Sequence, residues 1–92
     1  MSVKIELTDG DFRWTNLPTP IWAGNIELQA GVHLRALYRG ARTGRMVAET
    51  YSFWVNHRGR LDGSGFREIT ESRWIDLCDL VGVDPHMTPE DL

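Results

Sequence analysis

The stretch that decides the fold is residues 47–57, VAETYSFWVNH, in which two kinds of side chain alternate along the chain. Val47 and Tyr51 fall on one phase of this alternation, and Thr50 and Trp54 fall on the other. A period of two with many β-branched and aromatic residues is typical of a strand that is paired on both edges. We therefore predict that this segment is the central strand of a sheet, with the Val47 phase facing the core.

Two more alternating segments precede this strand. Residues 3–14 alternate on both sides of an Asp-Gly turn signal, and this pattern predicts a hairpin. Residues 32–39 alternate as well, with Leu34 and Tyr38 expected on the core side and Leu37 on the other. They lead through a loop into the central strand and so predict a second hairpin. Shorter strands are predicted near residues 25–29 and 66–69.

The apolar residues take on helical spacing after residue 69. Thr70 is a suitable N-cap and Gly82 a suitable end, so the sequence predicts a helix over about residues 70–81. The residues expected to face the sheet are Trp74, Leu77, Cys78 and Val81, with Ile75 and Leu80 widening the apolar face. Residues 84–92 are predicted to form an irregular acidic tail.

These elements predict a small single α+β domain. It would contain an antiparallel sheet of about 4–6 strands, built from hairpins, with one C-terminal amphipathic helix packed on one face. The chain has 92 residues, of which 41% are hydrophobic, and this suffices for one core. Four Trp, three Phe and two Tyr are more rings than such a core encloses, so we expect one or two of them on the surface.

The cysteine content and the apolar runs indicate a compartment. Cys78 is the single cysteine and cannot form an intramolecular disulfide, and the N-terminus has no apolar run of signal-peptide length. No segment approaches the roughly 20 apolar residues that a membrane-spanning helix needs. We expect a reduced, cytoplasmic protein without a membrane partner.

The formal net charge of −3 conceals an uneven charge distribution. Residues 1–30 hold two basic and four acidic side chains, residues 31–70 seven and three, and residues 71–92 one and six. A basic hairpin region and an acidic helix and tail are therefore expected on different parts of the surface. The two regions could each face a partner, or they could pair with each other.

The basic region carries arginines with aromatic residues interleaved, a composition that suits nucleic-acid binding, in which arginines contact phosphates and rings stack on bases. A solvated face with a core beneath it explains the same composition. The candidate nucleic-acid contacts are Arg35, Arg39, Arg42, Arg45, Arg58, Arg60 and Arg67.

The helix and two tryptophans supply a second set of candidates, for contact with another protein. Carboxylates along one helix could meet an arginine-rich partner, although exposed helix faces are commonly charged. Trp54 is the ring expected to face away from the core, and Trp22 follows a proline-rich loop. The candidate protein contacts are Trp22, Trp54, Glu71, Asp76 and Asp79.

No motif in the sequence indicates catalysis, a metal or a cofactor. His33, His57 and His86 lie on separate elements, without the local pairs of zinc sites. Ser64 stands between two glycines and reads as a turn, and no phosphate-binding loop or nucleophile elbow is present. We expect neither catalytic residues nor a bound metal or cofactor, and we do not expect an enzyme.

A non-catalytic binding protein is the class that remains. Another protein is the more favoured partner, because the chain is acidic and Lys4 is its one lysine, while RNA or single-stranded DNA is the alternative. Size and charge alone give an analogy with small phage and mobile-element proteins that inhibit host nucleic-acid-handling complexes, anti-CRISPR proteins among them. An exposed strand edge could also pair two copies into a homodimer.

Overall fold

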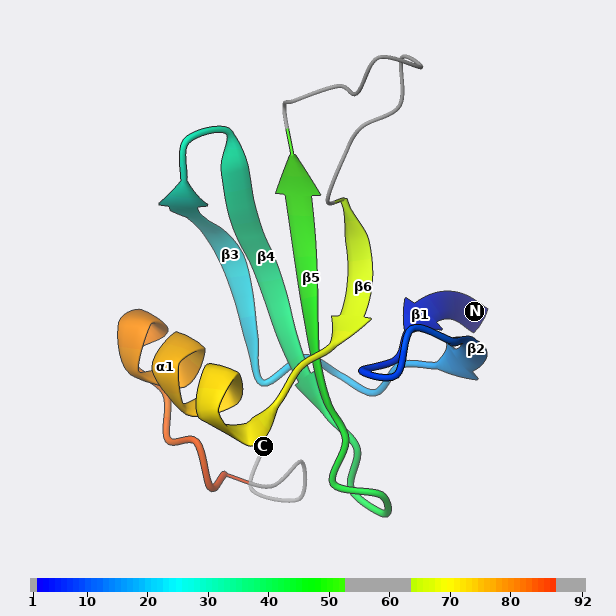
Figure 1. The fold of residues 1–92 in the computed structure, drawn as a ribbon. Coiled ribbons are helices and arrows are strands. Elements are labelled where there is room, and N and C mark those ends of the chain that lie inside the picture. Colours follow the sequence, from blue (N-terminus) through cyan, green and yellow to red (C-terminus); the bar gives the residue numbers. More distant parts are fainter. Residues whose placement is uncertain (1, 53–63, 88–92) are drawn as a thin grey trace, which may run out of the picture.

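The computed structural model describes residues 2–52 and 64–87 as a six-stranded sheet with one helix (Figure 1). The strands are β1 (Ser2–Glu6), β2 (Phe12–Asn16), β3 (Trp22–Gln29), β4 (Val32–Arg39), β5 (Met46–Ser52) and β6 (Gly65–Glu68), and the helix is α1 (Glu71–Val81). Their order across the sheet is β2-β1-β6-β5-β4-β3. The predicted α+β class is confirmed, and β5 lies inside the sheet between β4 and β6.

The sheet is mostly antiparallel, as predicted, and one pair of strands departs from this pattern. β1 pairs antiparallel with β2, β3 with β4, β4 with β5, and β5 with β6, as hairpins require. β1 and β6 instead pair in parallel, with Ile5 opposite Phe66 and Glu6 opposite Arg67. These two strands are separated by four others, and no turn fixes their relative direction, so a reading based on hairpins could not specify this pair.

A bulge in β4 changes which residues face the helix. Leu34 pairs with Thr50 of β5 and Ala36 pairs with Glu49, so the register shifts between the two positions. One extra residue in a strand moves the following side chains to the other face. Leu34 and Leu37 are consequently both fully buried in the core beneath α1. The predicted separation of Leu37 from that core is therefore wrong.

The core beneath α1 contains buried side chains from the sheet and from the helix: Ile21, Leu34, Leu37, Ala48, Trp74, Leu77 and Cys78. On β5 it is thus the phase of Ala48 that faces the helix, and the predicted phase of Val47 lies on the opposite face. Val47 is nevertheless buried. On that face it lies close to Ile5, Tyr38 and the loop that follows β2, which line a small hollow with it. The start of β5 is covered on both sides.

The helix begins and ends where the sequence predicts. The Thr70 hydroxyl accepts a hydrogen bond from the backbone N–H of Arg73 over 3.3 Å, and Gly82 adopts φ of 81°, the left-handed conformation of a helix C-cap. Ile75 and Leu80, expected to widen the buried face, are 41% and 54% exposed. α1 packs on the part of the sheet around β3, β4 and β5, which covers one stripe of the helix and leaves its flanks in solvent.

Candidate functional site

The described part of the sheet has two edge strands, β2 and β3, and they differ in the regularity of their pairing. β2 is first in the order of the sheet and pairs with β1 alone, over five residue pairs without irregularity. The opposite edge strand, β3, has two register shifts against β4. Regular edge strands offer backbone groups to a strand of another chain, whereas bulges hinder such pairing. β2 is therefore the edge better suited to accept a partner strand.

Two aromatic rings stand exposed on this edge strand. Phe12 is 58% exposed and Trp14 is 68% exposed. Their partners on β1 are Glu6 and Lys4, and the Lys4 ammonium lies 4.3 Å from the centroid of the Phe12 ring. The buried Ile5 pairs with Arg13, on the other face. The rings thus lie on the polar side of the first hairpin.

The two rings share a sheet face with α1 but lie beyond its reach. Phe12 pairs with Glu6, and Glu6 pairs in turn with Arg67. Arg67 pairs with Ala48. Paired residues of neighbouring strands point to the same side of the sheet, so Phe12 and Ala48 share a face. Ala48 is beneath the helix, while β2 lies at the far end of the sheet in Figure 1. The helix therefore covers one half of this face and leaves the aromatic half uncovered.

Phe12 and Trp14 are not among the contacts predicted from the sequence, although the sequence contains a signal for their exposure. In a hairpin that turns at Asp9-Gly10, Phe12 and Trp14 fall opposite Glu6 and Lys4, which form the polar phase of the first strand. An apolar phase opposite a polar one is a sign of exposure.

The structure places the predicted protein contacts in several environments. Trp22 is half-buried and packs against the core beneath α1, and Trp54 lies outside the described residues. Glu71, Asp76 and Asp79 are exposed along the helix, and among the residues described no ion pair involves them. The acidic surface of α1 is therefore not neutralised by the basic region as far as the structure describes it.

The predicted nucleic-acid contacts that fall within the described residues lie on different elements of the fold. Arg39 donates a hydrogen bond to the Pro85 carbonyl over 2.8 Å, and Arg45 forms an ion pair with Glu68. The exposed ones are Arg35 and Arg67 in different strands and Arg42 in the loop between β4 and β5, while Arg58 and Arg60 lie outside the described residues.

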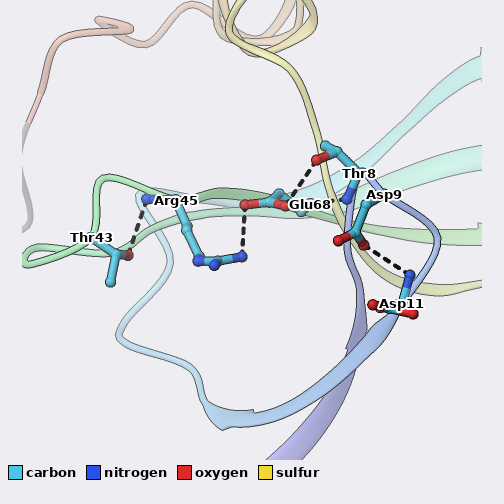
Figure 2. A network of polar contacts seen from close by, with 6 residues as sticks. All are labelled: Thr8, Asp9, Asp11, Thr43, Arg45 and Glu68. Atoms are coloured by element: carbon cyan, nitrogen blue, oxygen red, sulfur yellow. Dashed lines mark hydrogen bonds and ion pairs between the residues drawn. The ribbon is translucent and has the colours of Figure 1, made fainter.

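The Arg45 and Glu68 pair belongs to a polar network that joins three segments of the chain (Figure 2). Arg45 Nη1 and Glu68 Oε2 are 3.0 Å apart, and Glu68 Oε1 accepts hydrogen bonds from the backbone N–H and the hydroxyl of Thr8. The Thr43 hydroxyl accepts a hydrogen bond from the backbone N–H of Arg45. The Glu68 side chain is only 16% exposed, so this network connects the first hairpin to β6 and to the loop before β5.

The titratable groups of the described residues give no sign of an activated nucleophile. Burial raises the pKa of the Cys78 thiol to about 11, with nearby Arg39 lowering it and Asp84 raising it less strongly. Burial, with the negative charge of Glu49, also raises the pKa of Tyr38. Within residues 2–52 and 64–87, no three His, Cys, Asp or Glu side chains are grouped so that they could hold a metal ion.

Comparisons with models of protein families, with curated proteins and with solved structures give no match. In the part of the chain that is described, no helix has the length and apolar character needed to cross a bilayer. The information on function therefore comes from the chain's own residues.

Proposed function

We propose that this chain is a non-catalytic protein-binding module, of the inhibitor or adaptor type, that docks on its partner through the outer edge of β2. The observation that carries the proposal is the exposure of Phe12 and Trp14, two large rings on one edge strand. Tryptophan and other large aromatic residues are enriched among the residues that supply most binding energy in protein interfaces. More than half of the surface of each residue is exposed to solvent and is available to a partner.

The binding mode that fits this edge is addition of a strand from the partner. A partner strand would pair its backbone with β2, and its alternate side chains would contact the rings of Phe12 and Trp14, which are two residues apart on one face. Backbone pairing would supply part of the affinity, and the two rings would supply the rest together with the specificity. Asp76 and Asp79 would form a second, electrostatic contact with a basic partner.

An affinity experiment with matched baits tests this function. The tagged wild-type chain, the double variant Phe12→Thr, Trp14→Thr and the double variant Ile75→Ala, Leu80→Ala are compared by quantitative mass spectrometry of proteins captured from the native host. Threonine preserves strand propensity and alanine preserves helix propensity, so both variants keep the fold. We expect the wild type and the helix variant to retain the same partner and the β2 variant to lose it. Equal retention by all three baits contradicts the proposal.

The identity of a captured partner tests the inhibitor hypothesis. If the chain resembles anti-CRISPR proteins in action as well as in size and charge, the protein lost from the β2 variant is a component of a host nucleic-acid-handling complex. A partner from unrelated machinery would limit the function to that of an adaptor.

Nucleic-acid binding is the alternative, and one observation favours it. Arg67 lies on the same face of the sheet as Phe12, so a basic side chain and exposed rings share one surface. Titration of mixed oligonucleotides at several salt concentrations separates the two functions, because phosphate contacts weaken steeply with salt. We expect no binding at low salt. Salt-dependent binding that is lost on changing Arg35, Arg42 and Arg67 to Gln would establish the alternative.

A second copy of the chain is another partner that the β2 edge could accept. Two β2 strands placed edge to edge would join two sheets around a twofold axis. Sedimentation over a range of concentrations tests this arrangement, since self-pairing predicts a dimer that the Phe12→Thr, Trp14→Thr variant cannot form. Monomers at every concentration would exclude a homodimer and would leave a different protein as the partner.

A further inference from the structure

A hollow lies on the sheet face beside α1, separate from the β2 edge. Its volume is about 660 Å³, within the range of small-molecule sites. Residues from the sheet and from the helix line it, among them Thr50, Ser52, Arg67, Ile69, Arg73 and Leu77. A second hollow of about 330 Å³ adjoins it and shares Arg67, Ile69 and Arg73. The two arginines therefore stand at the boundary between the hollows.

Arg67 and Arg73 approach this boundary from different elements, the strand β6 and the first turn of α1. Both are exposed, and within the described residues neither guanidinium group has a hydrogen-bond or ion-pair partner. A guanidinium group binds carboxylates and phosphates through a planar fork of donors. Two such forks lining one hollow suit an anionic group.

The surrounding residues select the larger hollow for that anion. None of the described residues that line it is acidic, whereas Glu6 and Glu68 line the smaller one. A negative group would be repelled by these carboxylates and attracted to the side where the arginines stand alone. The larger hollow also has apolar walls, to which Ile69 and Leu77 contribute. Its lining thus combines positive charge with apolar surface.

We propose that this hollow binds a small organic anion, with the phosphate or carboxylate between Arg67 and Arg73 and the apolar body against Ile69 and Leu77. The site uses residues of β6 and α1, with Ile69 between these two elements, and none of the exposed β2 rings. It is therefore independent of the protein-binding function, and either can fail without the other.

Titration followed by two-dimensional NMR of the ¹⁵N-labelled chain tests the site with defined probes. Phenyl phosphate and benzoate carry both an anion and a ring, inorganic phosphate carries only the anion, and benzyl alcohol carries only the ring. We expect saturable shifts at the amides of Thr50, Ile69, Arg73 and Leu77 with the first two probes. Inorganic phosphate and benzyl alcohol should each bind at least about tenfold more weakly than these two probes, because each lacks one kind of contact. A stronger response to phenyl phosphate or to benzoate would identify the preferred anion.

Three matched variants complete the test. Arg67→Gln and Arg73→Gln should each raise the dissociation constant for phenyl phosphate about tenfold, because each removes a charged hydrogen-bond donor. Arg42→Gln changes an exposed arginine away from the hollow and should leave the constant unchanged. Unsaturable shifts, shifts centred on Phe12 and Trp14, equal affinity for benzyl alcohol, or wild-type affinity in both hollow variants would each overturn the proposal. The probe comparison on the wild type remains decisive even if a variant fails to fold.

Discussion

The indole nitrogen of Trp74 donates a hydrogen bond to the carbonyl oxygen of Pro85 over 2.9 Å. Arg39 donates a second hydrogen bond to the same oxygen. Trp74 is 1% exposed, so solvent does not reach its indole N–H and a protein group has to accept the hydrogen bond. The described residues after the helix, 83–87, are therefore fixed through Pro85 to α1 and to β4.

Replacing Trp74 by Phe should lower the free energy of unfolding by about 2–3 kcal/mol, because it removes a buried hydrogen bond and leaves a void. Trp14→Phe is the matched control, since the same chemical change at a ring that is 68% exposed should stay within about 0.5 kcal/mol. Urea unfolding followed by circular dichroism measures both. Similar losses in the two variants would contradict the assigned environments.

The ion pair between Arg45 and Glu68 should be energetically coupled. Glu68→Gln is expected to cost about 1–2 kcal/mol, because the partly buried carboxylate accepts charged and neutral hydrogen bonds. Glu27→Gln is the control, because that carboxylate is 62% exposed and lies 3.7 Å from its partner His33. A double-mutant cycle with Arg45→Met should give a coupling energy of about 1 kcal/mol. Additive effects of the two changes would show that the pair contributes nothing.

Cys78 should react very slowly in the folded protein. Its side chain is fully buried and its pKa is raised to about 11, so at about pH 8 the reactive thiolate is on the order of a hundredfold rarer than in the unfolded chain. Reaction with Ellman's reagent with and without denaturant measures the difference. Equal rates under both conditions would contradict the burial of this residue.

The same thiol should make stability fall in alkaline solution. Below the ordinary pKa of 9.0 both the folded and the unfolded chain keep the proton, and the contribution of the thiol is complete. As the pH rises from 9.0 toward about 11, the unfolded chain loses this proton while the folded chain retains it, so the unfolded state is favoured. The stability difference between wild type and Cys78→Ala should shrink across this window. A constant difference would refute the raised pKa.

The sequence was most informative where a local signal determines the structure. Three local signals locate the helix, and each acts over only a few residues. They are the cap at Thr70, the left-handed turn at Gly82 and the helical spacing of Trp74 and Leu77. The first hairpin follows in the same way from alternation around a turn.

Features that depend on distant residues could not be predicted in this way. Alternation defines two phases of a strand but not which of them faces the helix. The sequence therefore placed Val47 on the core side, whereas Ala48 is the residue that faces the helix. The parallel pairing of Ile5 with Phe66 joins strands far apart in the chain. The bulge near Ala36 belongs to the pairing of β4 with β5, and alternation along β4 alone does not reveal it. The exposed rings of the candidate site were missed for a related reason, since their exposure depends on which part of the sheet α1 covers.

Site-specific crosslinking at position 14 tests the protein-binding function most directly. A photoreactive benzophenone amino acid replaces Trp14 in one version of the chain and Glu27, on the opposite edge strand β3, in the other. After irradiation in the native host and nuclease treatment, we predict a crosslink to one partner protein from position 14 and none from position 27. A partner crosslinked only from position 27, or equally from both positions, would contradict docking through the β2 edge.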